Sequence, residues 1–325
     1  MRVGVYLDLR NPRPWRRPWA DHYARSLEWV EEAERLGADS VWLSEHHFFD
    51  DGYLPQPLTF AAALAARTRR MRIGTAILLA PLRSALQMAE EAAVVDNLSG
   101  GRLDLGLGAG YVAREFAAFE TDLEGRYGRT DQRIREIRSL LAGTDLTPPP
   151  VQDPLPLWLG YQGPQGAARA GRLGVGLLSL NPASLAPYRA GLAEGGHDPG
   201  QARMAGLVSA VVSDDPESDR EVLLPHIAHQ LNTYREAAAG RPVKPVTPEM
   251  LRENAGGGRA FQATEIVNPE TLIARVSEQT RDLPVHEVYF WLSIAGMPDT
   301  LVRRHLDLLC GQVRPALADL GLRAD

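Results

Sequence analysis

The sequence predicts an α/β fold, a single (β/α)8 barrel, on three observations. Short apolar runs rich in β-branched residues alternate with amphipathic helical stretches along the 325 residues, which is the pattern of βαβ units and a parallel sheet. Eight such units fit a chain of this length. The dinucleotide fingerprint expected of an open, doubly wound sheet fails, because the glycine run that begins at Gly106 has Tyr111 in place of its last glycine.

The expected elements follow from hydrophobic periodicity and from the residues that interrupt it. Strands are expected at 3–8, 40–44, 71–79, 102–107, 155–159, 175–180, 205–212 and 285–291. Helices are expected at 21–36, 57–68, 84–98, 129–141, 165–173, 183–191, 217–239 and 300–320. Gly37 and the run Ser99-Gly100-Gly101 are typical helix ends, and the prolines at 148–150 indicate a loop.

One segment breaks this rhythm. Residues 240–267 carry three prolines and the run Gly256-Gly257-Gly258, and they form a long insertion between the seventh and eighth strands. Because barrel loops on this face carry function, we interpret the segment as a lid over the site, with a disordered loop as the alternative. Residues 1–325 are otherwise expected to form one domain.

Composition excludes several classes of function. The formal net charge is −6, which argues against a nucleic-acid-binding surface, and no apolar run reaches the ~18 residues of a membrane span. The single cysteine, Cys310, excludes an internal disulfide and lies in an apolar helix, where a core role is expected. The N-terminus reads as a strand and not as a signal peptide, so a cytoplasmic protein is expected.

Candidate chemistry follows the strands, since the ends of barrel strands face the active site. Glu45, His46 and His47 follow the second strand. Neighbouring side chains on a strand point to opposite faces, so the two histidines are not expected to share a metal ion, and we predict no metal site. One histidine pointing into the barrel mouth would serve as acid, base or hydrogen-bond donor. The alternative is a structural pair that caps the turn.

Two glycine-rich turns are candidate ligand contacts. Gly108-Ala109-Gly110-Tyr111 follows the fourth strand, where small residues allow close approach of a ligand, although a tight turn would use the same residues. After the fifth strand, the run 160–166 opens a helix at about Gln165. Backbone N–H groups at a helix start bind anions, so a phosphate is plausible here, with an ordinary loop as the alternative.

Several segments, in this order, resemble the bacterial luciferase-like flavin-dependent monooxygenase family. They are GADSVWLSEHHF (37–48), RIGTAILLAP (72–81), DNLSGGRLDLGLGAGY (96–111), WLGYQGPQGAARAGRLG (158–174) and EVYFWLSIAGMPDTLVRR (287–304). The similarity covers nearly the whole chain. It implies the same (β/α)8 barrel that the alternation of elements predicts.

The resemblance also implies a cofactor and a reaction. The cofactor would be FMN, as FMNH2 supplied by a separate flavin reductase. Reaction with O2 would give a C4a-hydroperoxyflavin that oxygenates a small organic substrate, and members of the family usually form homodimers. Two alternatives stay open: an F420-dependent oxidoreductase that transfers hydride without O2, and a non-catalytic flavin-binding protein.

By the same resemblance, His46 matches the catalytic histidine and Glu45 stands beside it as a candidate orienting group. Ala76 and Ile77 match a non-proline cis peptide that supports the flavin ring, and Tyr6 would line the ring pocket.

The phosphate is assigned by resemblance to the loop after the fifth strand, with one arginine as its cation. These residues are Gln162, Gly163, Pro164, Gln165 and Gly166, with Arg126 or Arg129. The chain has Gly108 where light-emitting members carry a reactive cysteine, so light emission is not expected. It has Ala109 where they carry a phosphate-binding arginine, which leaves the phosphate to the loop amides and to Arg126 or Arg129.

Overall fold

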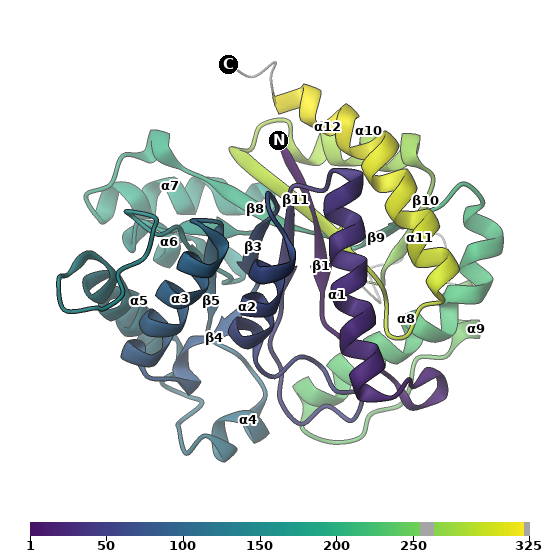
Figure 1. Ribbon diagram of the computed structural model, residues 1–325, viewed down its shortest axis with the longest axis horizontal. Coiled ribbons are helices and arrows are strands. Elements are labelled where there is room, and N and C mark those ends of the chain that lie inside the picture. Colours follow the sequence, from purple (N-terminus) through teal and green to yellow (C-terminus); the bar gives the residue numbers. More distant parts are fainter. Residues whose placement is uncertain (254–262, 322–325) are drawn as a thin grey trace.

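The computed structural model describes residues 1–253 and 263–321, and eight parallel strands form a closed barrel in them (Figure 1). β1 pairs with β2 on one side and with β11 on the other, and β3 pairs with β5, so the sheet closes on itself. The predicted fold class is confirmed. The barrel strands are β1 (Arg2–Leu7), β2 (Ser40–Leu43), β3 (Arg72–Thr75), β5 (Leu103–Gly108), β6 (Leu157–Leu159), β7 (Gly176–Leu178), β8 (Met204–Val208) and β11 (Val285–Trp291).

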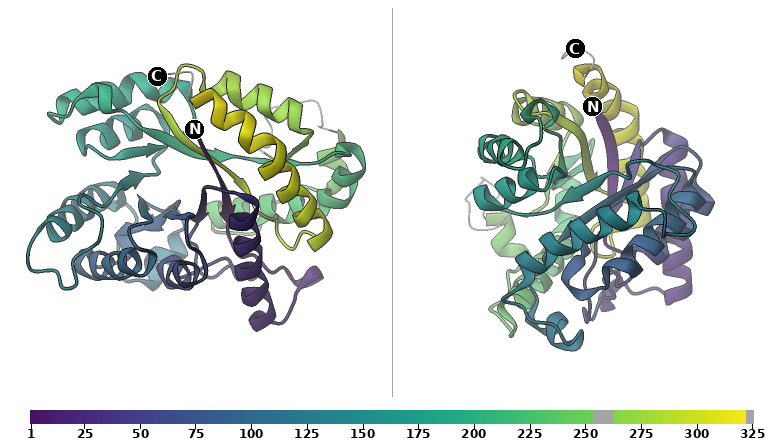
Figure 2. Two further views of the ribbon diagram at one scale, coloured as in Figure 1. Left: turned by 45° about the horizontal axis from the view of Figure 1, so that its top comes forward. Right: turned by 90° about the vertical axis from the view of Figure 1, so that its left-hand side faces the viewer.

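Helices form the outer layer around the strands (Figure 2). As predicted, α1 ends at Gly37 and α3 at Gly100, with φ of 105° and 68°, a backbone conformation that favours glycine. The helices are α1 (Trp19–Leu36), α2 (Pro57–Arg67), α3 (Ala85–Ser99), α4 (Ala113–Ala118), α5 (Arg126–Ala142), α6 (Gly163–Arg172), α7 (Leu185–Glu194), α8 (Pro216–Ala239), α9 (Pro248–Glu253), α10 (Pro269–Thr280), α11 (Asp299–Leu308) and α12 (Arg314–Gly321).

Three predicted elements are divided in the structure. The third strand is β3 followed by the short β4 (Leu78–Leu79), with a cis peptide bond between Ala76 and Ile77, as the resemblance implied. The seventh strand continues beyond β8 as β9 (Ala210–Val212), which leaves the barrel and pairs in parallel with β10 (Glu265–Val267). The last predicted helix is interrupted by a π-helical turn at Leu309–Val313.

The insertion at 240–267 is not structureless, because it contains α9 and β10. Residues 254–262 lie outside the described residues, so the interpretation of the segment as a lid stays a prediction. No helix in the described ranges is long and apolar enough to cross a membrane.

A column of aromatic rings fills the barrel interior. Trp42 stacks on Tyr289 with 5.1 Å between ring centroids, and Tyr289 stacks on Tyr6 at 5.5 Å. The residue beside Trp42 on the neighbouring strand β3 must be glycine, because a Cβ on Gly74 would lie 2.4 Å from the Trp42 ring. The column therefore closes the barrel from inside and leaves its carboxyl-terminal end as the open one.

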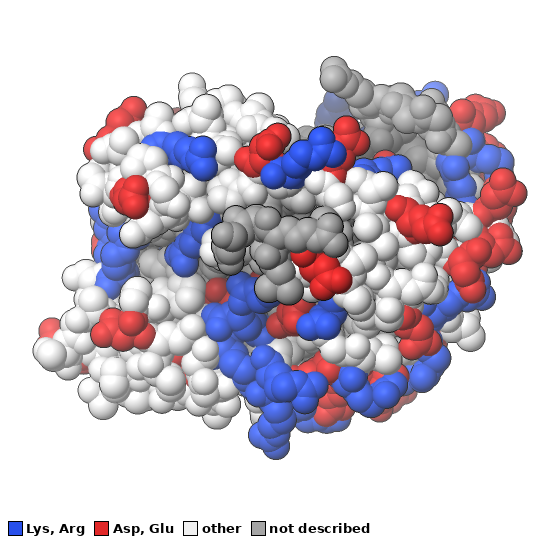
Figure 3. All heavy atoms as spheres, turned by 90° about the horizontal axis from the view of Figure 1, so that it is seen from above, with Lys and Arg blue, Asp and Glu red and all other residues white. Residues whose placement is uncertain are grey.

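Charges of both signs lie side by side on the face where the strands begin (Figure 3). Arg67 of α2 pairs with Glu31 of α1 at 2.6 Å, and the backbone N–H groups of Arg70 and Met71 donate to Glu34. These contacts hold the carboxyl-terminal ends of two neighbouring helices together. Since the pairs are largely exposed, each contributes little to stability.

A buried histidine connects the strand that leaves the barrel to the last barrel strand. His305 of α11 is fully buried; its Nδ1 accepts from the backbone N–H of Val212, and its Nε2–H donates to the carbonyl of Trp291, both at 2.9 Å. Burial lowers the pKa of His305 to about 4, because the imidazolium would lose its hydration.

This predicts a pH-dependent loss of stability. From pH 6.5 down to about pH 4 the unfolded chain binds a proton at His305 that the folded chain does not, so the free energy of unfolding falls by up to about 3 kcal/mol. His305→Gln keeps a donor and an acceptor but does not titrate. Urea unfolding across this pH range should give a smaller acid loss in H305Q than in the wild type. Parallel pH profiles would contradict the assignment.

Candidate active site

Two neighbouring cavities open at the carboxyl-terminal end of the barrel. The larger, of about 590 Å³, lies toward β7 and β8, and the smaller, of about 360 Å³, lies toward β2 and β5. Both are lined by Tyr6, Ala76, Ile77, Gly160 and Gln162. The two cavities therefore meet at the strand ends, where barrel enzymes place their active sites.

The wall between the cavities is built around the Ala76–Ile77 peptide. The Tyr6 hydroxyl donates to the Ala76 carbonyl at 2.8 Å, which fixes this wall to β1. A Cβ on Gly108 would lie 2.3 Å from Ile77 Cδ1, and one on Gly160 would lie 2.5 Å from Ile77 Cγ2. The two glycines thus make room for Ile77. Gly108 supports the wall from behind instead of lining a cavity.

His46 faces the smaller cavity, as the alternation of strand side chains predicts for one of the two histidines. Its Nδ1–H donates to Glu115 Oε1 at 2.9 Å, and its Nε2 lies 3.4 Å from the Tyr111 hydroxyl. The backbone N–H of His47 donates to the same Glu115 oxygen at 2.7 Å. Glu115 is fully buried, so it holds the imidazole in one orientation with Nε2 toward the cavity.

The expected role of Glu45 beside His46 is wrong. Its carboxylate accepts from His47 Nε2 at 3.0 Å, from Arg83 at 2.7 Å and from the backbone N–H of Leu79 at 2.7 Å. Burial alone would raise the pKa of Glu45, but these donors outweigh it and lower that pKa. Glu45 is therefore a charged anchor between β2 and β4. Glu115, which the sequence analysis did not select, orients His46.

The predicted phosphate loop lies only partly at the cavities. Gln162 lines both, and α6 begins at the next residue. Gly163 has a φ of 74°, and a Cβ on Gly166 would lie 2.6 Å from Tyr161 Cβ. Gly163, Pro164, Gln165 and Gly166 therefore form the first turn of α6 behind Gln162 and do not line the cavities.

The two candidate arginines stand outside the cavity lining. Arg126 donates to the Leu123 carbonyl at 3.1 Å, and Arg129 donates to the Asp122 carbonyl at 2.7 Å. Tyr127, whose ring Arg126 covers at 4.5 Å, lines the smaller cavity instead. Among the described residues, no lysine or arginine lines either cavity.

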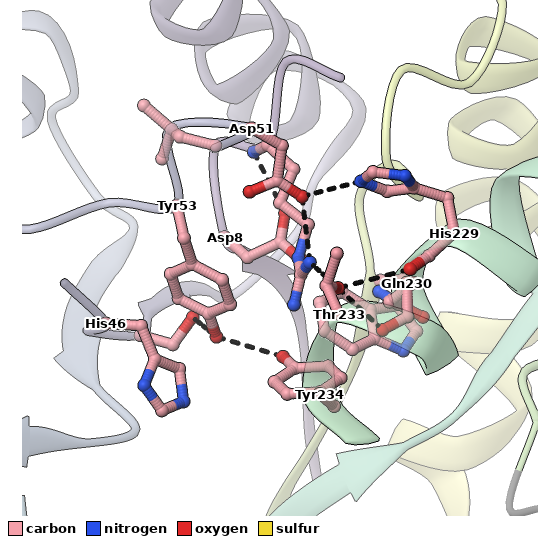
Figure 4. Close-up of polar contacts among 12 residues, drawn as sticks. Asp8, His46, Asp51, Tyr53, His229, Gln230, Thr233 and Tyr234 are labelled. Carbon is pink, nitrogen blue, oxygen red and sulfur yellow. Dashed lines mark hydrogen bonds and ion pairs between the residues drawn. The ribbon is translucent and has the colours of Figure 1, made fainter. Parts of the chain in front are cut away.

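A buried charged cluster lies next to the smaller cavity, and the sequence analysis did not select its residues (Figure 4). Arg10 lies three residues after the end of β1 and donates to Asp8 at 3.0 Å and to Asp51 at 2.9 Å. Asp51 also pairs with His229 of α8 at 2.8 Å. The sequence does carry a signal for Arg10, because it follows the first strand, and residues that follow barrel strands are candidates for the site.

Comparison with known proteins is consistent with this geometry. The family model described as luciferase-like monooxygenase matches residues 1–287. The chain is 30% identical over 160 residues to the oxygenase component of a flavin-dependent trigonelline monooxygenase from Acinetobacter baylyi, covering 44% of each chain. It is 30% identical over 182 residues to an F420-dependent glucose-6-phosphate dehydrogenase from Amycolatopsis mediterranei, covering 50% of this chain and 55% of the relative. The chain spans about half the length of these curated relatives, or less.

Solved structures match over nearly the full length. The monooxygenase RslO1 from Streptomyces bottropensis superposes with a TM-score of 0.80 at 25% identity, covering 98% of this chain and all of that one. An F420-dependent secondary alcohol dehydrogenase shares the fold, with a TM-score of 0.73 at 19% identity over 97% of this chain and 98% of the other. With the family model matched along most of its length, the chain belongs to the luciferase-like monooxygenase family.

Proposed function

We propose that the chain is the oxygenase of a two-component flavin-dependent monooxygenase. It would take FMNH2 from a separate flavin reductase and use O2 to oxygenate a small organic substrate. The observation that carries the proposal is His46, held by Glu115 with Nε2 toward a cavity whose wall is the Ala76–Ile77 peptide. Relatives named as a flavin-dependent trigonelline monooxygenase and as a limonene 1,2-monooxygenase support it.

The residues at the cavities fit a flavin. The wall formed by Ala76 and Ile77 presents only small or aliphatic side chains. Gly108 and Gly160 leave space for the Ile77 side chain. Tyr6 supports the wall from β1. The cavities, of about 590 and 360 Å³, are in the range of cofactor sites. A planar ring system would therefore lie against this wall, with both cavities available to the rest of the cofactor and to the substrate.

The polar lining favours FMN over F420. Ser179, Asn181 and Gln162 line the larger cavity and offer neutral donors, which suit a single phosphate. The glutamyl tail of F420 would call for additional cations, and in the described lining neither cavity provides a lysine or an arginine. F420 remains the second candidate because F420-dependent relatives match the chain.

Bound here, reduced FMN would supply the electrons that activate O2. The chain contributes proton control through His46. Since Glu115 accepts the hydrogen bond from Nδ1, Nε2 is the ring atom that can donate a proton to an oxygen atom in the cavity and take one back. Tyr111, at 3.4 Å from Nε2, is the neighbouring hydroxyl. The barrel wall and the aromatic rings around His46 keep this position apart from bulk water.

We also propose that the protein forms a homodimer through α3. Leu86, Val94 and Leu98 of this helix are 49%, 45% and 54% exposed, although each is a large apolar side chain. They lie eight and four residues apart, so they share one face of the helix. An exposed apolar face of this kind indicates an interaction site.

The dimer is tested with Leu98→Glu. Light scattering should show a dimer for the wild type and a monomer for L98E, because a buried, unpaired carboxylate is costly. Val222→Glu on α8, which is exposed to 46%, is the matched control and should stay dimeric. A monomeric wild type would disprove the proposal.

The cofactor is tested by anaerobic titration of the purified protein with FMNH2 and with reduced F420, followed by admission of air. We expect FMNH2 to bind more tightly and to show a transient oxygen-dependent absorbance. Gly160→Ala should weaken FMNH2 binding, because the new Cβ displaces Ile77 into the cavity. Tighter F420 binding with no oxygen-dependent change would assign hydride transfer instead, and flavin bound without turnover would indicate a non-catalytic binding protein.

The role of His46 is tested once a substrate is in hand. In His46→Ala, FMNH2 should bind and O2 should still be consumed, but product formation should fall by about 10²-fold, as loss of a general acid predicts. His286→Gln, at the opposite end of the barrel on β11, is the matched control. Unchanged product yield in H46A would refute the role.

A further inference from the structure

The smaller cavity is unusually rich in tyrosine. Six of the chain's nine tyrosines line it: Tyr6, Tyr53, Tyr111, Tyr127, Tyr161 and Tyr234. Three of them surround His46, with ring centroids 4.8 Å (Tyr53), 5.3 Å (Tyr111) and 6.0 Å (Tyr234) from the imidazole. The aliphatic side chains of the lining, Ile77 and Leu79, belong to the wall at β3 and β4. The space next to His46 is therefore bounded by aromatic faces and edges, which favour another aromatic ring.

Two of these rings are held by Arg10. Its guanidinium carbon lies 4.6 Å from the centre of the Tyr53 ring and 4.4 Å from that of the Tyr234 ring. Arg10 is itself fixed by Asp8 and Asp51 and contacts the Thr233 hydroxyl. Because Tyr53 follows β2 and Tyr234 lies on α8, this buried cation positions two rings from distant parts of the chain.

The two hydroxyls form one hydrogen-bonded chain. The Tyr53 and Tyr234 hydroxyl oxygens are 3.0 Å apart, and the Tyr53 hydroxyl donates to Ser44 Oγ at 2.6 Å. Burial raises the pKa of both tyrosines, so both hydroxyls stay protonated. A chain of hydroxyls can reverse its direction, so Tyr234 at its end can accept from a hydroxyl group or donate to a carbonyl.

Charge in the lining argues for an uncharged ligand. Glu45 lines the cavity, but both of its oxygens are used by His47, Arg83 and the Leu79 amide. Arg10 lies behind the rings, is 2% exposed, and is paired with two carboxylates. A charged group entering the cavity would lose its hydration, and among the described residues no lysine or arginine lines the cavity to pair with an anion.

We propose that Tyr53 and Tyr234, positioned by Arg10, bind the hydroxyl or carbonyl oxygen of an uncharged aromatic substrate and direct its ring to His46. The proposal depends on the proposed monooxygenase function only for the reaction that the bound substrate would undergo. Substrate recognition is assigned to these two tyrosines independently of the cofactor.

The test measures binding to the full chain without flavin or O2. Fluorescence titration with 2-naphthol and with naphthalene should show that 2-naphthol binds several-fold to about ten-fold more tightly, as one buried hydrogen bond predicts. Anionic 2-naphthoate should bind more weakly than 2-naphthol, and 1-decanol should compete poorly with it. Equal affinity for naphthalene and 2-naphthol, or tighter binding of 1-decanol or 2-naphthoate, would overturn the proposal.

Variants locate the effect. Tyr234→Phe and, independently, Tyr53→Phe should abolish the preference for 2-naphthol while the affinity for naphthalene stays unchanged. Tyr23→Phe on α1, whose ring packs against Phe60 outside the cavity, is the matched control and should keep the preference. A preference that survives in both Y234F and Y53F would overturn the assignment.

Titration of the same preparations with FMNH2 separates the two proposals. Naphthol selectivity without FMNH2 binding would reject the monooxygenase and leave the aromatic site standing. FMNH2 binding without a preference for 2-naphthol would reject the aromatic site and leave the proposed flavin cofactor standing.

Discussion

The stacking of Trp42, Tyr289 and Tyr6 is the constraint on which the site depends. The column fills the barrel from within, and its last member, Tyr6, donates to the Ala76 carbonyl in the wall between the two cavities. Gly74 gives Trp42 its space, and Gly108 and Gly160 give Ile77 its space. Core packing and cavity shape are thus one arrangement, because the ring that ends the core is also the ring that supports the wall.

Buried ionisable side chains around the site position the groups that line the cavities. Glu115 sets the orientation of His46, Glu45 anchors the loop that carries both histidines, and Arg10 holds two tyrosine rings. Glu45 and Arg10 form buried ion pairs, and Glu115 accepts from His46 Nδ1–H and from the backbone N–H of His47. Apart from the Glu45 carboxylate, whose oxygens are already engaged, the polar side chains that line the cavities are an imidazole, hydroxyls and amides. The positions of these groups are thus fixed by buried polar contacts behind the cavity lining.

The barrel, and the fact that one of the two histidines faces the site, could be predicted from the sequence, because both follow from periodicity. The same alternation that separates His46 from His47 places Glu45, two residues before His47, on the side of His47, so the choice of Glu45 as the orienting group contradicted the pattern. Glu115 could not be found in this way, since it lies 69 residues from His46 on a helix, α4, too short to show periodicity. Tyr234 comes from α8, where nothing in the sequence indicates which turn of the helix approaches the barrel mouth.

Arg2 of β1 pairs with Glu287 of β11, which lies 285 residues further along the chain. During synthesis, β1 can pair with β2 early, but its other edge has no partner until β11 has left the ribosome. An unpaired strand edge can pair with strands of other molecules, so this edge of β1 is open to aggregation until residues 285–291 are available. Because this contact joins residues so far apart in the sequence, we expect closure of the barrel to be slower than the formation of any single helix or hairpin.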